Sequence, residues 1–185
     1  MKKILMTLTA VFCSVMAISV LSSCSKDDKG NNDAPDTTPA SVKVMFIYHF
    51  PDDMLQFIDM TAEYLDENGN VQSEKITSPA WIKDITATKL PAKLGARLHL
   101  AKKSGVDYKE VSQVTTGAKI TRSYSLLNKA GTMLKGVEEG NFSYNGNWLS
   151  GEGIVQFIEK EGKNFATLLL EFDANGKETQ GEWKD

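Results

Sequence analysis

The sequence predicts an all-β fold, namely an antiparallel β-sandwich of immunoglobulin-like or related type with room for one short helix. From residue 41 onward, short runs rich in β-branched and aromatic residues recur, and several alternate between apolar and polar positions. Asn-Gly occurs at residues 68–69, 145–146 and 175–176. This dipeptide favours hairpin turns, because both central residues of a type I′ turn need positive φ. A small β-barrel is the alternative.

The first half of this region predicts five strands. Residues 42–50 are apolar on both faces at their middle, as in a strand inside a sheet. Residues 57–66 and 71–77 flank the first Asn-Gly and predict a hairpin, although the apolar spacing of residues 54–65 also fits a helix. Residues 81–89 predict a strand, and the alternation of residues 94–101 predicts another.

The second half predicts a helix and a meander. Residues 118–127 alternate and predict a strand, whereas residues 126–137 have helical spacing. Two hairpins are then expected, one joining residues 142–144 to 147–149 and one joining 164–172 to 177–183, with a strand at 153–159 between them.

The first residues have the features of a signal peptide: Lys2 and Lys3, an apolar run over residues 4–20, and the small pair Ser22-Ser23. Leu21-Ser22-Ser23-Cys24 resembles the lipobox of bacterial lipoproteins. The resemblance implies that the chain is cut before Cys24, whose thiol and new amine are acylated. More than one acyl chain gives stable membrane attachment.

The next four residues, Ser25, Lys26, Asp27 and Asp28, resemble the export signal of surface lipoproteins in Bacteroidota. This resemblance implies an outer-membrane lipoprotein that faces the cell exterior; the plainer alternative is the start of a charged linker. Residues 25–40 contain no large apolar side chain and predict a flexible tether. The expected organisation is a signal peptide at 1–23, lipidated Cys24 with a tether to residue 40, and one domain at 41–185.

Composition excludes several function classes. Cys13 leaves with the signal peptide and Cys24 carries lipid, so the domain has no thiol for a disulfide, a nucleophile or a metal site. Loss of Lys2 and Lys3 leaves 19 basic against 24 acidic residues, a charge near −5, which argues against nucleic acid as a partner. The sequence has no nucleophile elbow and no phosphate loop. We therefore expect no catalytic residue, cofactor or metal.

Charge is unevenly distributed along the domain. Residues 41–80 carry −5, residues 81–135 carry +8 and residues 136–185 carry −6. The basic segment could form a patch for an anionic glycan or an acidic partner. The alternative is that basic strands lie beside acidic ones and are neutralised by them. The candidate ligand-binding residues are Trp81, Trp148, Lys83, Arg97, Lys102 and Lys103.

These observations favour a cell-surface lipoprotein that acts as a non-catalytic binding or interaction module. Its membrane contact is the N-terminal lipid, and its partner is a glycan or a protein. Exposed aromatic rings such as that of Trp148 are suited to stacking on sugars or anchoring an interface. Two alternatives stay open: a periplasm-facing lipoprotein with a structural role in the envelope, and a small glycan-acting hydrolase with a pair of carboxylates.

Overall fold

The computed structural model describes residues 34–184, and for residues 141–145 it describes the backbone alone. The strands are β1 (Ser41–His49), β2 (Ile58–Leu65), β3 (Val71–Ile76), β4 (Ala80–Ala87), β5 (Ala92–Lys102), β6 (Val114–Leu127), β7 (Met133–Leu149), β8 (Phe165–Phe172) and β9 (Glu178–Gln180). The helices are α1 (Met54–Phe57) and α2 (Gly151–Glu161).

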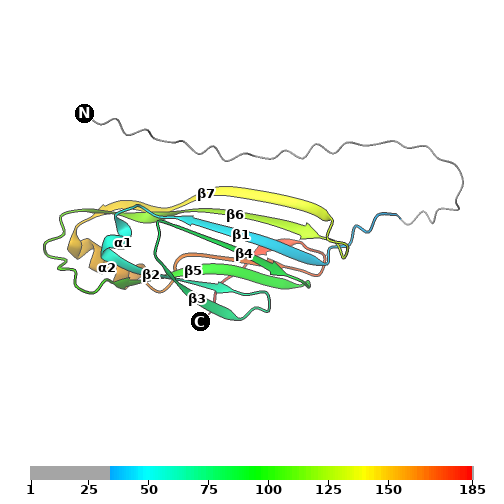
Figure 1. Cartoon of the computed structure of the whole chain (residues 1–185), viewed down its shortest axis with the longest axis horizontal. Helices are drawn as coiled ribbons and strands as arrows, with labels where there is room; N and C mark the ends of the chain where they lie inside the picture. Colours follow the sequence, from blue (N-terminus) through cyan, green and yellow to red (C-terminus); the bar gives the residue numbers. More distant parts are fainter. Residues whose placement is uncertain (1–33, 185) are drawn as a thin grey trace, which may run out of the picture. The chain divides into compact units, whose positions relative to one another are not determined.

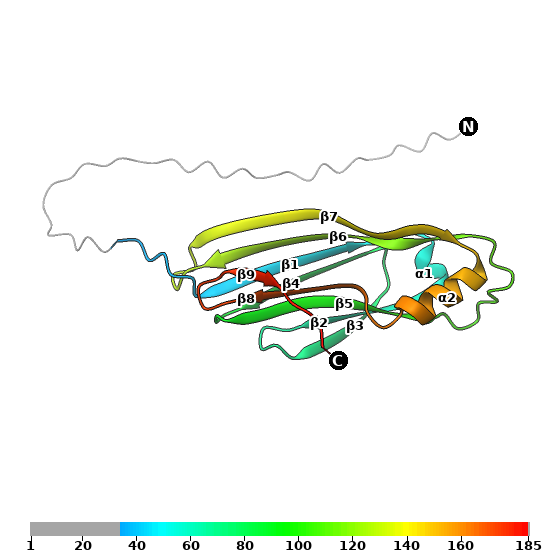
Figure 2. The same cartoon turned by 180° about the vertical axis from the view of Figure 1, so that it is seen from behind.

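The strands form two antiparallel sheets packed face to face, which confirms the predicted β-sandwich (Figures 1 and 2). One sheet has the order β4-β1-β6-β7, and the other has the order β3-β2-β5-β8-β9. The sheets are not closed into a barrel, so the alternative prediction was wrong.

The core follows from the alternation of apolar residues. Val42, Val44, Phe46 and Tyr48 of β1 are fully buried, whereas His49 at the end of the strand is exposed. Leucines and an alanine at alternate positions of β5 complete the layer from the other sheet. The Tyr48 hydroxyl donates to a carbonyl oxygen of that sheet at 3.0 Å, so this buried polar group is satisfied across the core.

Three hairpins share one turn chemistry, Asp or Asn followed three residues later by glycine. The turns join β2 to β3, β6 to β7 and β8 to β9. Their glycines have φ between 73° and 78°; these are Gly69, Gly131 and Gly176. In each turn the first side chain accepts a hydrogen bond from the backbone N–H four residues later, at 2.8 or 2.9 Å. The turns are therefore of type I with a glycine bulge, which at residues 68–69 and 175–176 replaces the predicted type I′ turn.

The predicted helix over residues 126–137 was wrong. These residues form the end of β6, the turn at residues 128–132 and the start of β7. The Asn128 side chain holds the turn and Gly131 adopts positive φ, and both features interrupt a helix. Leu126 is 4% exposed and Met133 is 62% exposed, so the apolar residues do not share one buried face.

The Asn-Gly in the middle of the chain, at residues 145–146, forms no hairpin, and here the prediction was also wrong. Residues 145–146 lie inside β7, which pairs with β6 on both sides of them. Thr116 lies opposite Asn147 and Ala118 lies opposite Tyr144, so two residues of β7 face one residue of β6. Asn-Gly therefore accommodates a β-bulge instead of reversing the chain.

The predicted strand at residues 153–159 is instead helix α2. Ser150 caps it, because its side chain accepts a hydrogen bond from Gly153 N–H at 3.3 Å. Ile154 and Ile158 are buried one helical turn apart. The ambiguous residues 54–65 contain both of the predicted structures, since the single turn of α1 leads directly into β2.

An ion pair joins the two sheets near each side of the sandwich. On one side Lys83 of β4 lies 2.9 Å from Glu74 of β3. On the other side Arg122 of β6 lies 3.0 Å from Glu178 of β9. Because β9 has three residues and β7 has 17, much of β7 has no strand opposite it in the second sheet.

The hairpin glycines differ in their surroundings, which makes a stability comparison possible. A methyl group at Gly69 would meet no atom within 4 Å, whereas at Gly176 it would come within 2.8 Å of Leu126. We expect Gly69→Ala to destabilise the fold by about 1–2 kcal/mol through backbone strain alone, and Gly176→Ala to destabilise it further. Urea unfolding of both variants checks this. Equal losses would show that the contact with Leu126 relaxes freely.

Candidate functional site

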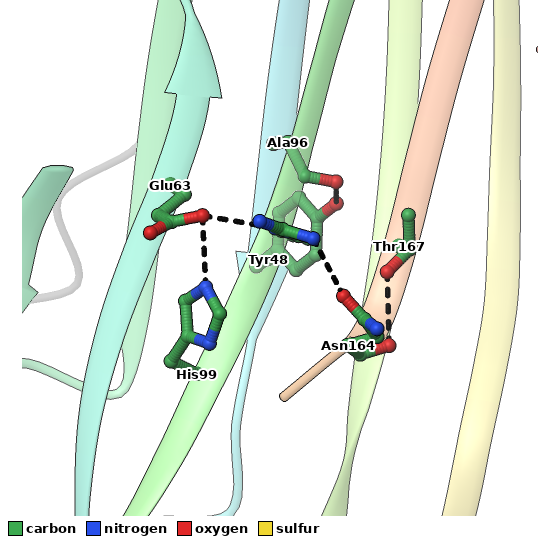
Figure 3. Close-up of polar contacts among 7 residues, drawn as sticks. Tyr48, Glu63, Ala96, His99, Asn164 and Thr167 are labelled. Atoms are coloured by element: carbon green, nitrogen blue, oxygen red, sulfur yellow. Dashed lines mark hydrogen bonds and ion pairs between the residues drawn. The ribbon is translucent and has the colours of Figure 1, made fainter. Parts of the chain in front are cut away.

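The densest polar cluster lies on the outer face of the five-stranded sheet and is centred on Arg97 of β5. Its guanidinium donates to Glu63 at 2.9 Å and to the Asn164 side chain at 2.7 Å. His99 Nε2 lies 2.8 Å from the same Glu63 oxygen. Figure 3 shows Glu63 and His99 directed toward each other, with Asn164 on the opposite side of the cluster. Arg97 is 8% exposed although it points away from the core.

Trp183 covers this cluster. Its ring centre lies 4.8 Å from the Arg97 guanidinium carbon, a distance that fits a cation–π contact. Gly181 N–H donates to the Leu169 carbonyl at 2.9 Å, which holds the residues after β9 against the sheet. The polar edges of Arg97 and its flat face are therefore both engaged within the chain, as expected for a structural role.

The charge state of Glu63 also favours a structural role for the Arg97 cluster. Burial raises its pKa, but hydrogen bonds and charges from His99 and Arg97 outweigh that effect, so the pKa lies below its ordinary value. His99 Nε2 is buried and lies 2.8 Å from a Glu63 carboxylate oxygen. A carboxylate held in its ionised form is a poor general acid.

An open basin of about 640 Å³ lies beside the cluster. Leu65, Val71 and Leu169 give it an apolar part, and Trp183 also lines it. Its charged lining includes Lys93 and Glu171, which lie 2.5 Å apart and so neutralise each other. The basin therefore combines an apolar part with charged side chains, which also include Glu182 and Lys184.

A second hollow, of about 300 Å³, lies on the exposed face of the four-stranded sheet. It is lined by His49, Phe50, Pro51, residues 115–119 and Gly146. His49 and Lys119 are cross-strand partners and both are exposed. Gly117 and Gly146 lie at the bulge between β6 and β7, and neither fills the hollow with a side chain. A methyl group at Gly146 would meet no atom within 4 Å.

Trp148 stands next to this hollow. It lies directly opposite Thr115, which lines the hollow, so the two side chains project from the same face of the sheet. The Trp148 side chain is 70% exposed, the highest value among the large hydrophobic residues that the structure describes. Packing within the chain therefore does not account for this indole, which was a candidate ligand-binding residue from the sequence.

The other candidate residues are engaged elsewhere. Trp81 is 6% exposed, and its indole N–H donates to Glu74. Lys83 forms an ion pair with the same glutamate, and the Lys103 ammonium donates to the Leu55 carbonyl at 2.6 Å. Lys102 is exposed at the end of β5. These residues and Arg97 come from different faces and edges, so the structure does not gather them around one ligand.

The basic segment is neutralised in part by the acidic segments, as the alternative interpretation predicts. It supplies β4, β5 and β6, whereas the acidic segments supply β2, β3, β8 and β9. Each of four ion pairs joins a basic residue of 81–135 to a glutamate of an acidic segment; they are Lys83–Glu74, Lys93–Glu171, Arg97–Glu63 and Arg122–Glu178. Four of the eleven cations of this segment are therefore held in ion pairs within the chain, and they include Lys83 and Arg97 of the predicted patch.

Several expectations concern residues outside this description. Cys24 and the export residues Ser25 to Asp28 lie outside the described residues. Within residues 34–184 neither helix is long and apolar enough to cross a bilayer. The same part of the chain contains no group of three or more His, Cys, Asp or Glu side chains placed to hold a metal ion.

Comparison with known proteins identifies no relative. No protein-family model matches the chain, and no match was found among curated proteins or solved structures. We therefore infer the function from the geometry of the chain itself.

The Arg97 cluster predicts a pH-dependent loss of stability. Arg97→Met leaves the Glu63 carboxylate poorly compensated and should destabilise the fold by about 2–4 kcal/mol at pH 7. Because the folded pKa of Glu63 is lowered, the stability it contributes is present above its unfolded pKa and is lost as pH falls through the folded pKa. The loss caused by Arg97→Met should therefore shrink in acid.

Urea unfolding at pH 7 and below pH 4 measures this difference. Lys93→Met is the matched control, because the Lys93 side chain is 64% exposed in its ion pair. Its loss should stay within about 1 kcal/mol. Equal losses for the two variants at pH 7 would contradict a stabilising role for the cluster.

Proposed function

We propose that this chain is a lipid-anchored, surface-displayed binding module without catalytic activity, and that its ligand is a glycan held at the hollow beside Trp148. The observation that carries the proposal is the 70% exposed indole of Trp148 at the edge of a 300 Å³ hollow. Large exposed apolar rings commonly mark binding sites, because leaving them in water is unfavourable.

The shape of the hollow supports a ring-shaped ligand. A flat indole presents a face on which the C–H groups of a sugar ring can stack. Thr115 and Lys119 lie at the two ends of the lining stretch of β6, roughly 13 Å apart for four residues of strand. This length suits one or two sugar rings, and the volume lies near the lower end of the range of known ligand pockets.

Polar groups around the hollow supply hydrogen-bonding capacity. The Thr115 hydroxyl, the His49 imidazole and the Lys119 ammonium surround an otherwise apolar lining. Thr115 N–H donates to Asp53 Oδ2 at 3.1 Å, which ties this end of β6 to the residue preceding α1. The hollow is thus held by hydrogen bonds before any ligand arrives, which lowers the entropic cost of binding.

The charge distribution favours a neutral over a strongly anionic ligand. Lys119 brings one positive charge, and the Asp53 carboxylate contacts the backbone of Thr115 at the other end of the lining stretch of β6. Lys83 and Arg97 of the predicted basic patch are engaged in ion pairs. An uncharged sugar needs neither group to be displaced from its contacts.

Substitution of Trp148 tests this assignment. Trp148→Ala should weaken binding of the strongest glycan ligand by roughly 2 kcal/mol, about thirtyfold. The ligand would be selected on a glycan array with the wild-type protein, and affinities would be measured by titration calorimetry. Gly146→Val should also weaken binding, because its side chain would enter the hollow.

Ile82→Ala is the matched control. Ile82 is 59% exposed on the same face of the same sheet, yet it lies on β4, outside the lining of the hollow. Its substitution should leave affinity unchanged. Array binding that Trp148→Ala leaves unchanged would contradict the assignment, as would an array without any wild-type binding.

The anchor is tested independently of the ligand. Cys24→Ala should abolish incorporation of labelled palmitate and release the protein from membranes, because the acylated thiol is lost. On intact cells, added protease should degrade the wild-type protein together with a known surface protein. Protection of the wild-type protein alone would favour the periplasm-facing alternative.

A further inference from the structure

Strand β7 is the edge of the four-stranded sheet and has an open side along its length. It pairs with β6 on one side, and Figure 2 shows it as the outermost strand of its layer. No loop or turn within residues 34–184 forms a backbone hydrogen bond to it. A long edge strand is a template on which another strand can add.

The regular part of β7 is residues 135–140, which pair without a break with residues 121–126 of β6. Lys135, Val137 and Glu139 lie opposite Leu126, Tyr124 and Arg122 respectively. Leu126 and Tyr124 are buried between the sheets, so these three residues of β7 project toward the inner side. Charged residues at such positions disfavour pairing with an apolar strand.

The same charges are complementary to a second copy of β7. A twofold axis perpendicular to the sheet pairs two β7 strands antiparallel and keeps every side chain on its own face. If the axis passes beside Val137, then Val137 faces its symmetry mate and Lys135 of each copy faces Glu139 of the other. Two cross-strand pairs of opposite charge result, a favourable arrangement in a sheet.

Neighbouring registers lack this complementarity. An axis at Glu138 or at Glu139 would set a glutamate directly against its own copy, which is unfavourable. An axis at Gly136 would place Lys135 opposite Val137. The sequence of the regular segment therefore selects one self-pairing register.

The ion pairs at this edge favour the same register. Arg122 contacts both Glu139 and Glu178, so two carboxylates share one guanidinium. Lys135 is exposed and forms no ion pair with the described residues; its ammonium lies beside Tyr124, with Nζ 5.8 Å from the ring centre. Lys135 of a second copy would bring a positive charge to Glu139.

We propose that β7 is a homotypic interface, through which two copies of this chain pair antiparallel about Val137 and join their four-stranded sheets into one. The paired segment is short, so the association is weak in dilute solution. Attachment to a common membrane surface raises the effective concentration and favours the pair. The interface is separate from the hollow beside Trp148, and its assignment does not require that site.

Disulfide trapping in the full-length protein on cells tests this register. The twofold axis would place the two copies of Val137→Cys about 4.5–5.5 Å apart between Cα atoms, within the range that a disulfide spans. Mild oxidation should then give a covalent dimer on a non-reducing gel. Lys129→Cys, in the β6–β7 turn, is the control for random collision, because its two copies would lie tens of ångströms apart.

Charge reversal in the Val137→Cys background adds a second test. Lys135→Glu should reduce the covalent dimer at least fivefold by setting glutamate against glutamate, and Glu139→Lys should do the same with lysines. The double reversal should restore the dimer, and Lys129→Glu should not change it. Lys135→Glu breaks no ion pair among the described residues, so its effect does not depend on the Arg122 contacts.

The outcomes separate clearly. Trapping at residue 137 that exceeds trapping at residue 129, together with restoration by the double reversal, supports the interface. Equal trapping at the two positions, or trapping that the single reversals leave unchanged, would overturn it.

Discussion

Ion pairs between segments of opposite charge determine which kinds of ligand the surface of this protein can bind. The basic segment 81–135 contributes β5, which lies between acidic β2 and β8, and β4, which faces β3 across an edge of the sandwich. Four of its eleven cations are therefore paired with glutamates of the same chain. A surface without a concentrated charge binds through shape and aromatic faces, and for this reason Trp148 gains weight as a binding residue.

Alternation of apolar residues was sufficient to predict the sandwich and most of its inner strands. In β1 and β5 the core side chains occupy every second position. A helix buries every third or fourth residue instead, so this alternation indicates a strand. Helix α2 was missed because its apolar residues also fit a short strand. The N-cap at Ser150 was the signal that distinguishes the two, since its side chain satisfies a free N–H of the first turn.

The Asn-Gly dipeptides predicted neither the turn type nor every hairpin correctly, for a physical reason. Asn-Gly supplies a glycine that tolerates positive φ, and a type I turn with a bulge, a type I′ turn or a mid-strand bulge can each use it. At residues 68–69 and 175–176 an aspartate two residues before the asparagine closes the turn through its side chain. At residues 145–146 the equivalent position holds Ser143 instead of an aspartate, and β7 continues through the dipeptide.

The candidate site could be predicted only in part. Trp148 was a candidate from the sequence, although the Asn-Gly turn expected beside it does not form. The hollow was not predicted, because Gly117 and Gly146 are brought together by the pairing of β6 with β7. The Arg97 cluster was equally hidden, since its partners come from β2, β5 and the loop before β8. Single residues can be chosen from composition, whereas their partners depend on strand order and register.

The bulge and the proposed interface together give β7 two separate tasks. Its regular half presents a free edge to a second copy, and its far end carries Trp148 and the glycine that keeps the hollow open. Because a twofold axis perpendicular to the sheet preserves its faces, both hollows of a pair would open on the same side. Two weak sites that face one way bind a repeating glycan far more tightly than either does alone. Strand pairing at the edge would thus increase the strength of the proposed glycan binding without adding any contact to the site.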